Sequence, residues 1–383
     1  MSPIKKSMLG NLLLLAVASI FSLILGEGVL RFSTDHPITR ESNQISDEIL
    51  GYRVNPEFED IDKNGFRNSE DIRPLIAAIG DSHTYGSNVS SEGSWPRQFS
   101  KLAGLQTYNF GIGSYGVYSY HPLVQRAAES EMKAVIVAVY PPNDFAPVFS
   151  YCKINRDSQF WTQEAARLQL NFPPCNNVPT EESFTESIKN FIYYETAIGS
   201  ILISNIRPIK SRWLDAPIEG TNEIVTPWNL NAFKKHMDLG NPAISYLLED
   251  FGRFIKDWVK ISASEDVVVS LLIIPSKQLS LSKYAETKGI KQVSREIISA
   301  IEKEQLIVKM ILDAAERYGL PATSALPEVV EAKQNLISEF LYHRDGHPKA
   351  EGYAAYAKAA LRLLRETCLS DHTKEICTYL PSQ

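Results

Sequence analysis

Five short runs of apolar residues are spread along the chain, and each is bounded by glycine, proline or polar residues. They span residues 74–80, 106–111, 134–140, 266–276 and 320–326. Their apolar residues are consecutive and do not alternate with polar ones, which is typical of strands in a sheet that is covered on both faces. We therefore predict five buried β-strands, of which the run at 320–326 carries the weakest pattern.

Helical periodicity fills the intervals between these runs. Ser94 and Pro96 mark one helix start, because serine is a favoured N-cap and proline suits the first turn. Between residues 245 and 261 the apolar side chains recur at helical spacing and form a single stripe. Further helices are predicted at 121–132, 292–318 and 351–366. The alternation of strands and helices predicts a three-layer α/β/α fold, doubly wound around a mostly parallel five-stranded sheet.

The N-terminus carries an uncharged run over residues 8–26, which contains one amide, Asn11, and follows Lys5 and Lys6. About 20 apolar residues suffice for a helix to cross the hydrocarbon core of a bilayer. Lysines ahead of such a helix favour an N-terminus in the cytoplasm and the bulk of the chain outside. We expect an uncleaved membrane anchor within residues 1–31, and the alternative is a cleaved signal peptide. In either case the globular part is exported.

Composition divides the rest of the chain. Residues 32–73 are polar and turn-rich, which predicts a stalk and a lead-in to the first strand. The α/β domain is expected over 74–366, with an insertion or cap at 148–240, and a short tail at 367–383. The insertion shows no convincing strand but is rich in aromatic residues. We expect these mainly to form a small core of the insertion itself; they are Phe160, Trp161, Phe172, Phe184, Phe191, Tyr193, Tyr194, Trp213 and Trp228.

Charge and cysteine content limit which binding partners and which cellular compartment are consistent with the sequence. The formal net charge is −6 and no block rich in lysine or arginine occurs, so the sequence lacks the electrostatic footprint of a nucleic-acid-binding protein. The four cysteines form two pairs close in sequence, Cys152 with Cys175 and Cys368 with Cys377. An oxidising compartment permits two local disulfides, and the alternative is four free thiols. No cysteine or histidine cluster has metal-site spacing, and we expect neither a metal nor a cofactor.

Reactive side chains follow the predicted strands. In an open α/β sheet, ligands bind beyond the carboxyl ends of the strands, and Ser82, Asn143, Asp345 and His347 are expected to converge there with the segment 109–116. Together they supply the parts of an acyl-transfer site. Ser82 would be the nucleophile, His347 would take its proton, and Asp345 would orient the imidazole. The backbone of Ser82, Gly113 and Ser114 and the amide of Asn143 would donate hydrogen bonds to the oxyanion.

This set resembles the SGNH hydrolases, the GDSL family of esterases and acyltransferases. Residues 80–82 (Gly-Asp-Ser) match the first block of that family, the segment 109–116 the second, Asn143-Asp144 the third and residues 345–348 the last, in the family's order. The resemblance covers residues 74–145 and 265–366, and it implies a flavodoxin-like SGNH fold and a Ser-His-Asp triad. The segments around residues 63–70 and 94–99 are similar to membrane-anchored or secreted bacterial members.

Three positions depart from the family's pattern. Pro141-Pro142 stand where block three usually has Gly-x before the Asn-Asp pair. In block two the second glycine of the usual pattern falls on Ser114, with Gly113 one residue earlier, so either backbone N–H can be the oxyanion donor. His83 stands where the family name places leucine, and we interpret it as part of the pocket wall.

Two acidic residues next to these site positions are expected to have structural roles only. Asp81 and Asp144 are expected to brace turns by Asx-type hydrogen bonds and not to act as acids.

The function predicted from these features is a serine esterase that acts outside the cytoplasmic membrane, with ester or O-acylated carbohydrate as substrate. The first alternative is an O-acetyltransferase that passes the acyl group from Ser82 to a hydroxyl of an envelope polysaccharide. The second is a catalytically silent module that binds glycan. The expected partners are this substrate and, through the N-terminal helix, the membrane.

Overall fold

The structure is a computed structural model. It describes residues 22, 44–69, 72–146, 152, 154–172, 216–217, 224–225, 230–289, 295–335, 341–342 and 346–380. The chain divides into two units, Met1–Gln44 with Pro179–Arg212, and Ile45–Val178 with Trp213–Gln383. Apart from Ser22 and Gln44, all described residues belong to the second unit. This unit carries the sheet and every site discussed below.

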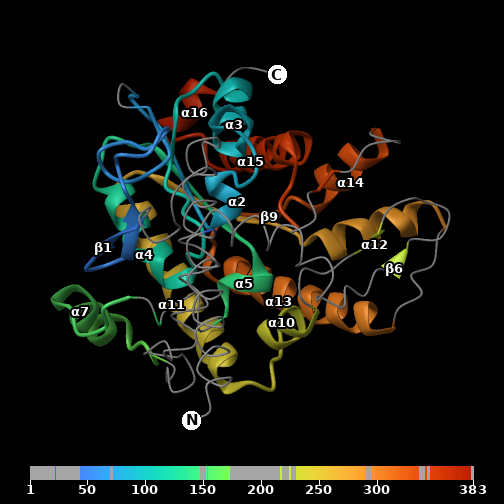
Figure 1. Ribbon diagram of the computed structural model, residues 1–383. Helices are drawn as coiled ribbons and strands as arrows, with labels where there is room; N and C mark the ends of the chain where they lie inside the picture. The colour runs from blue at the N-terminus through green and yellow to red at the C-terminus, as the bar shows by residue number, and fades with distance from the viewer. Residues whose placement is uncertain are drawn as a thin grey trace, which may run out of the picture. The chain divides into compact units, whose positions relative to one another are not determined.

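The five predicted strands are all present, and each lies within its apolar run. They are β3 (Ile76–Ile79), β4 (Thr107–Asn109), β5 (Ala134–Val139), β8 (Val268–Ile273) and β9 (Ala322–Ser324). They pair in parallel throughout, in the order β4-β3-β5-β8-β9. The last strand of this order, β9, is labelled in Figure 1. This is the flavodoxin-like order, in which the strand order changes direction between β3 and β5. The predicted parallel five-stranded sheet is confirmed.

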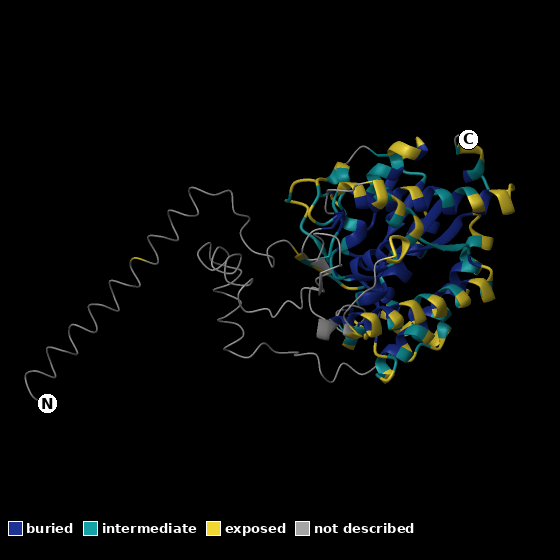
Figure 2. Cartoon of the chain, turned by 90° about the vertical axis from the view of Figure 1, so that its right-hand side faces the viewer, coloured by how far each residue is buried: buried dark blue, intermediate teal, exposed yellow. Residues whose placement is uncertain are grey.

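Neighbouring side chains along each strand point to opposite faces, and this alternation builds two cores. On one face Ala77, Val135 and Leu271 lie in a core with α4 (Val117–Ala128), α11 (Pro242–Ser264) and α13 (Arg295–Tyr318). On the other face Ile136 and Leu272 lie in a core with α3 (Trp95–Ala103) and α15 (Ala350–Ser370). Buried residues accordingly gather around the sheet (Figure 2). The three-layer arrangement explains why the strands read as continuous apolar runs.

Shorter elements complete the unit. They are β1 (Gln44–Asp47), β2 (Gly51–Val54), α2 (Ser82–Tyr85), η1 (Ser91–Gly93), α5 (Pro141–Asp144), α7 (Gln159–Leu168), β6 (Ala216–Pro217), β7 (Ile224–Val225), α10 (Leu230–His236), α12 (Lys277–Thr287), α14 (Leu326–Asn335) and α16 (Ile376–Tyr379). The helix predicted at 121–132 begins earlier, at Val117, and ends at Ala128. Pro122 lies within it, in the second turn.

Part of the expected insertion belongs to the main core, which corrects the sequence-based interpretation. Trp161 on α7 is fully buried in the same core as α4 and α11. Its Nε1 donates a hydrogen bond to the Ile49 carbonyl over 2.8 Å. Phe160 and Phe172 pack against that core as well. These three aromatic residues therefore do not form a separate core; the other aromatics named for the insertion lie outside the described residues.

The described part of the expected stalk and lead-in packs on the domain. Phe66 is fully buried, and the Asn109 backbone N–H donates to Asn68 Oδ1 over 2.8 Å. Asn68 Nδ2 in turn donates to the Asn109 carbonyl over 3.1 Å. These reciprocal bonds join the segment around Asn68 to the end of β4, where the second block of the site begins.

The disulfide between Cys368 and Cys377 is present and joins α15 to α16. Cys152 is disulfide-bonded too, while its predicted partner Cys175 lies outside the described residues. Among the helices of the described segments, none is both long enough and apolar enough to cross a membrane. Of the predicted anchor at 8–26, only Ser22 is described, so the anchor stays a prediction.

Candidate active site

The carboxyl ends of β3 and β5 lie next to each other at the centre of the sheet, the place where open α/β sheets bind ligands. Gly80 follows β3, and a Cβ atom there would lie 2.1 Å from Thr84 Oγ1 and 2.8 Å from the Ala138 carbonyl oxygen. Glycine is therefore required for the chain to turn at once from β3 into α2. This turn sets Ser82, the first residue of α2, at the rim of the sheet.

Ser82 and His347 meet at this rim, although 265 positions separate them in the sequence. The Ser82 Oγ atom and the His347 Nε2 atom are 2.8 Å apart, which is hydrogen-bond distance. His347 lies in the loop ahead of α15, directly after Gly346, whose φ of +95° suits glycine. The structure thus brings together the predicted nucleophile and the predicted base.

Asp345, the predicted third member of the triad, lies outside the described residues. Its contact with His347 and its role therefore stay predictions.

Backbone donors of the second block lie beside the nucleophile. A Cβ atom on Gly113 would be 4.0 Å from the Ser82 Cβ atom. The Tyr52 hydroxyl donates a 2.5 Å hydrogen bond to the Gly113 carbonyl, which fixes the peptide between Gly113 and Ser114. Because the C=O and N–H of a trans peptide point in opposite directions, the Ser114 N–H is directed away from Tyr52. Within the described residues, the N–H groups of Ser82, Gly113 and Ser114 donate to no backbone carbonyl.

Ser114 adopts a left-handed backbone conformation with a φ of +66°. This conformation costs a non-glycine residue roughly 1–2 kcal/mol and is where glycine is favoured. The position therefore has the geometry of the glycine that the family's pattern has there, although its residue is serine.

Asn143 is held at the rim by a carboxylate. It lies in α5, immediately after β5, and its Nδ2 donates to Asp81 Oδ2 over 3.1 Å. An amide nitrogen has two hydrogens, so one remains for an oxyanion. The predicted amide donor is therefore present and has its orientation set by Asp81.

Asp81 makes the hydrogen bond expected of a turn-stabilising residue and also contacts other side chains of the site. As expected, its Oδ1 accepts the His83 backbone N–H over 2.9 Å and so caps α2. Its Oδ2 lies 3.3 Å from Ser82 Oγ and 3.4 Å from His83 Nδ1. Burial opposes ionisation of Asp81, yet the charge of His83 and hydrogen bonds from His83 and Asn143 outweigh it, so that the pKa is lowered. Asp81 is thus a buried carboxylate directly beneath the nucleophile.

Asp144 behaves differently from Asp81. Its Oδ2 accepts the Tyr140 backbone N–H and the Tyr120 hydroxyl, each over 2.8 Å. Complete burial, together with the negative charge of Asp81, raises its pKa well above the ordinary value. Asp144 is accordingly a neutral brace for the turn between β5 and α5, which agrees with the structural role expected of it.

His83 lines the site, as the sequence-based interpretation has it. It is buried, and its ring lies between those of Tyr140 and His347, at centroid distances of 4.0 Å and 4.9 Å. Tyr140 and Tyr52 were not among the predicted site residues. Tyr140 follows a strand and Tyr52 lies within β2, and an aromatic residue at such a place is a weak signal because aromatic residues are common in cores.

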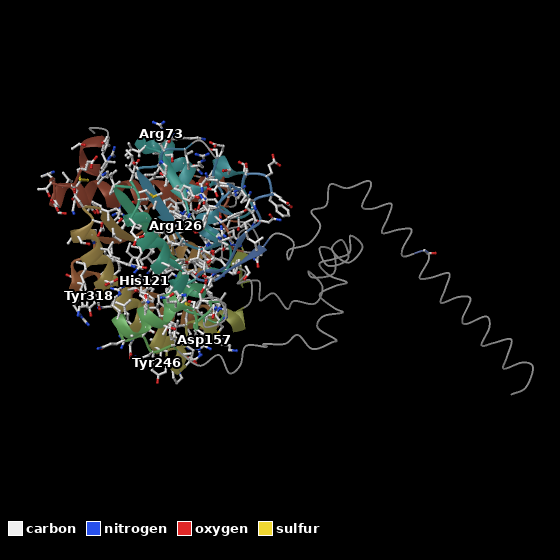
Figure 3. The ribbon with its side chains drawn as sticks, turned by 90° about the vertical axis from the view of Figure 1, so that its left-hand side faces the viewer. Arg73, His121, Arg126, Asp157, Tyr246 and Tyr318 are labelled. Atoms are coloured by element: carbon white, nitrogen blue, oxygen red, sulfur yellow. A yellow bond between two sulfur atoms is a disulfide. The ribbon has the colours of Figure 1, made fainter. Side chains whose placement is uncertain are left out.

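One cluster of acids and histidine resembles a metal site in composition. It contains His121 (Figure 3), Glu164 and Asp257. The Trp258 indole, which can only donate, lies 3.3 Å from His121 Nδ1, so Nε2 carries the hydrogen and donates to Glu164. The Arg167 guanidinium pairs with both carboxylates, at 2.5 Å and 2.6 Å. The Arg167 guanidinium already supplies the positive charge that a metal ion would bring to these carboxylates. We therefore interpret the cluster as an ion-pair network.

Comparisons with solved structures find two proteins of the G-D-S-L lipolytic family among those similar to this chain. One is a protein of the G-D-S-L lipolytic family from Desulfitobacterium hafniense DCB-2, with 15% identity over 75% of this chain and 98% of that chain, and a TM-score of 0.32. Another is a member of the lipolytic G-D-S-L family from Veillonella parvula DSM 2008, with 11% identity over 76% and 97% of the two chains, and a TM-score of 0.34. No family model and no curated protein sequence matches the chain. Because these TM-scores are below 0.5, the functional conclusion rests on the residues of this chain.

Proposed function

We propose that this protein is a serine esterase that hydrolyses acyl esters through an acyl-enzyme on Ser82. The observation that carries the proposal is the 2.8 Å contact between Ser82 Oγ and His347 Nε2 at the carboxyl edge of the sheet. A serine hydroxyl is a weak nucleophile until a neighbouring base accepts its proton. The pairing also follows the order of motifs in the SGNH family.

In the proposed acylation, His347 Nε2 takes the proton of Ser82 as Oγ bonds to the ester carbonyl carbon. The carbonyl electron pair moves to its oxygen, which the Asn143 amide and the N–H groups beside Ser82 stabilise. The bond to the leaving alcohol then breaks, and His347 gives that alcohol the proton. Asp345 would hold the imidazole in the required tautomer.

Deacylation repeats these steps with water. His347 takes a proton from the water as its oxygen attacks the acyl carbon. The bond to Ser82 Oγ breaks, the serine recovers a proton from His347, and the carboxylic acid leaves. If a sugar hydroxyl replaces water in this step, the same residues carry out the acyl transfer of the O-acetyltransferase alternative.

The test uses the full chain in detergent micelles with a series of p-nitrophenyl esters. Ser82→Ala and His347→Ala should each abolish turnover, and Asp345→Ala should reduce it less, because Asp345 orients and does not react. Ser264→Ala and His372→Ala change exposed residues and serve as matched controls. A fluorophosphonate probe should label the wild type at Ser82 and leave Ser82→Ala unlabelled. Turnover by a folded Ser82→Ala variant would refute the acyl-enzyme.

Glycan acceptors added to the assay distinguish hydrolysis from acyl transfer. Binding of glycan without any turnover would favour the catalytically silent module.

We also propose that residues 8–26 anchor the protein in the cytoplasmic membrane, with the esterase domain outside and acting on O-acyl groups of envelope carbohydrate. The disulfide between Cys368 and Cys377 supports an oxidising compartment. Protease added to intact spheroplasts should digest residues 40–383, and a protected domain would contradict this topology.

A further inference from the structure

The carboxylate of Asp81 poses an electrostatic problem for an acyl-transfer site. It is 1% exposed, and its Oδ2 lies 3.3 Å from the oxygen that must attack the ester. Negative charge develops in this place during the reaction, and a buried anion nearby opposes it. The same carboxylate competes with His347 for the hydroxyl proton of Ser82, because Oγ lies within reach of both acceptors.

His83 lies where it can cancel this charge. Its Nδ1 is 3.4 Å from Asp81 Oδ2, and both side chains are almost completely buried. A buried carboxylate is far more stable beside a cation than alone. His83 is also the residue at which the first block departs from the Gly-Asp-Ser-Leu pattern, and leucine has no charge to offer.

We propose that His83 is a positioning residue that acts through Asp81, a role that rests on the proposed function. As an imidazolium, His83 neutralises the Asp81 carboxylate. The Ser82 hydroxyl then turns to His347. The lowered pKa of Asp81, which burial alone would raise, agrees with a charged partner at this distance. Asp144, another described acid close to Asp81, has a raised pKa and is neutral. Of these two described acids, Asp81 is the anion that a charged His83 would neutralise.

The neighbours of His83 determine how the pair affects the base. The described titratable side chains that face its ring are Asp81, Tyr140 on the strand side, His347 from the loop ahead of α15, and Tyr356 on α15, at a centroid distance of 6.5 Å. Both tyrosines have raised pKa values because they are buried, and they stay neutral. With His83 charged, its positive charge balances the Asp81 carboxylate. Without it, that carboxylate would hold the Ser82 hydroxyl away from His347.

A double-mutant cycle tests the proposal. His83→Leu should lower kcat/KM about tenfold or more at pH 7, because the Asp81 carboxylate then keeps the Ser82 hydroxyl. Asp81→Asn removes the negative charge that His83 neutralises. The double variant with His83→Leu and Asp81→Asn should therefore be more active than His83→Leu alone. Losses that simply multiply in the double variant would mean that His83 only fills space and would overturn the proposal.

A second measurement does not depend on activity. Nitrogen-15 NMR of the full chain with labelled histidine should show both ring nitrogens of His83 protonated at pH 7.5, the signal being assigned by its loss in His83→Leu. Protonation should disappear in Asp81→Asn. A neutral His83 in the wild type overturns the inference while the esterase proposal stands. Activity that persists in Ser82→Ala overturns the esterase proposal instead, so the two failures are distinguishable.

Discussion

At the scale of single residues, Asn143 shows how one side chain depends on another. Its amide is useful to an oxyanion only while its second hydrogen is bound to Asp81, over 3.1 Å, because this bond fixes the plane of the amide. Asp81 in turn needs such donors to remain an anion in a buried place. Asn143, the proposed oxyanion donor, and Asp81, the carboxylate next to Ser82, are therefore parts of one hydrogen-bonded unit.

Replacement of Asn143 should affect the rate and not substrate binding. We expect Asn143→Ala to lower kcat by about a hundredfold or more with little change in KM, because its donor counts chiefly in the transition state. Steady-state kinetics with a p-nitrophenyl ester measure both constants, and Asn335→Ala, at the exposed end of α14, is the control. An unchanged kcat would show that Asn143 does not contact the oxyanion.

The sequence alone could propose Ser82, Asn143 and His347 as site residues, because each stands in a recognisable motif at a predicted strand end or ahead of the last helix. It could not assign more than a turn-bracing role to Asp81. That role depends on contacts with Asn143 and His83, which are set by how two strand ends are joined in space. Motif spacing carries no information on such contacts.

At the scale of elements, burial on both faces explains which predictions succeeded. Four of the five strands are buried along their whole length, and they were found because a strand covered on both faces is mostly apolar. β9, at the edge of the sheet, is only half-buried, which corrects the prediction of five buried strands and agrees with its weaker sequence pattern. The helix α12 was missed because its buried residues include Lys277, Gln278, Ser280 and Ser282, so that no apolar stripe marks it. Its polar groups are buried by other parts of the fold: Ser280, for example, accepts the Tyr342 hydroxyl over 3.0 Å.

The contact between α2 and the second block depends on a glycine. A Cβ atom on Gly111 would lie 2.3 Å from the Tyr85 backbone nitrogen and 2.5 Å from the Thr84 carbonyl carbon. Since neither backbone atom can move freely, Gly111→Ala should lower the free energy of unfolding by about 3 kcal/mol or more. Gly252→Ala, in α11 with open space around it, should raise it by about 0.5–1 kcal/mol. Urea denaturation measures both, and equal effects would contradict the close approach.

The start of α12 should make stability depend on pH. Glu304 on α13 is fully buried, and its carboxylate accepts the Ser276 backbone N–H over 2.8 Å and the Ser276 hydroxyl over 2.5 Å. Burial outweighs these bonds and raises its pKa to about 7. The folded state then keeps a proton that the unfolded chain releases above its ordinary pKa of 4.5, so stability falls as the pH rises from 4.5 through 7.

The expected loss is about 3 kcal/mol across this interval. Glu304→Gln should flatten the dependence, whereas Glu302→Gln, exposed on the same helix, should leave it unchanged. The measurement is urea denaturation at pH 5 and pH 8. The same slope in Glu304→Gln and the wild type would exclude Glu304 as the cause.

At the scale of the whole unit, a network of charges attaches α7 to α4 and α11, two of the three helices that cover one face of the sheet. Glu164 and Arg167 belong to α7, while His121 lies on α4 and Asp257 on α11. Arg167 contacts Asp257 through both of its terminal nitrogens, at 2.6 Å and 2.7 Å. Periodicity could not predict this attachment, because it joins three elements through polar side chains that a sequence pattern assigns to solvent. It brings Trp161 of α7 into the main core, where composition alone suggested a separate one.

Removal of Arg167 should therefore destabilise the unit, and more at neutral than at acid pH. Although burial opposes ionisation of Glu164, hydrogen bonds from His121 and Arg167 lower its pKa to about 2. The stabilisation is thus present above the ordinary pKa of 4.5 and is lost as the pH falls through 2. Arg167→Met leaves Glu164 and the buried Asp257 without their cation, which should cost about 1–2 kcal/mol at pH 7, a value reduced from that of a fully buried pair because the arginine side chain is 43% exposed.

Thermal unfolding followed by circular dichroism from pH 3 to pH 8 measures this difference. The control is Lys309→Met, which breaks an exposed pair with Asp313 on α13 and should change stability little. If Arg167→Met and Lys309→Met had the same small effect at every pH, the network would not be what joins α7 to the sheet. The contacts of Trp161, Phe160 and Leu168 with the core would then account for the attachment, and Trp161→Ala should destabilise the unit more than Arg167→Met does.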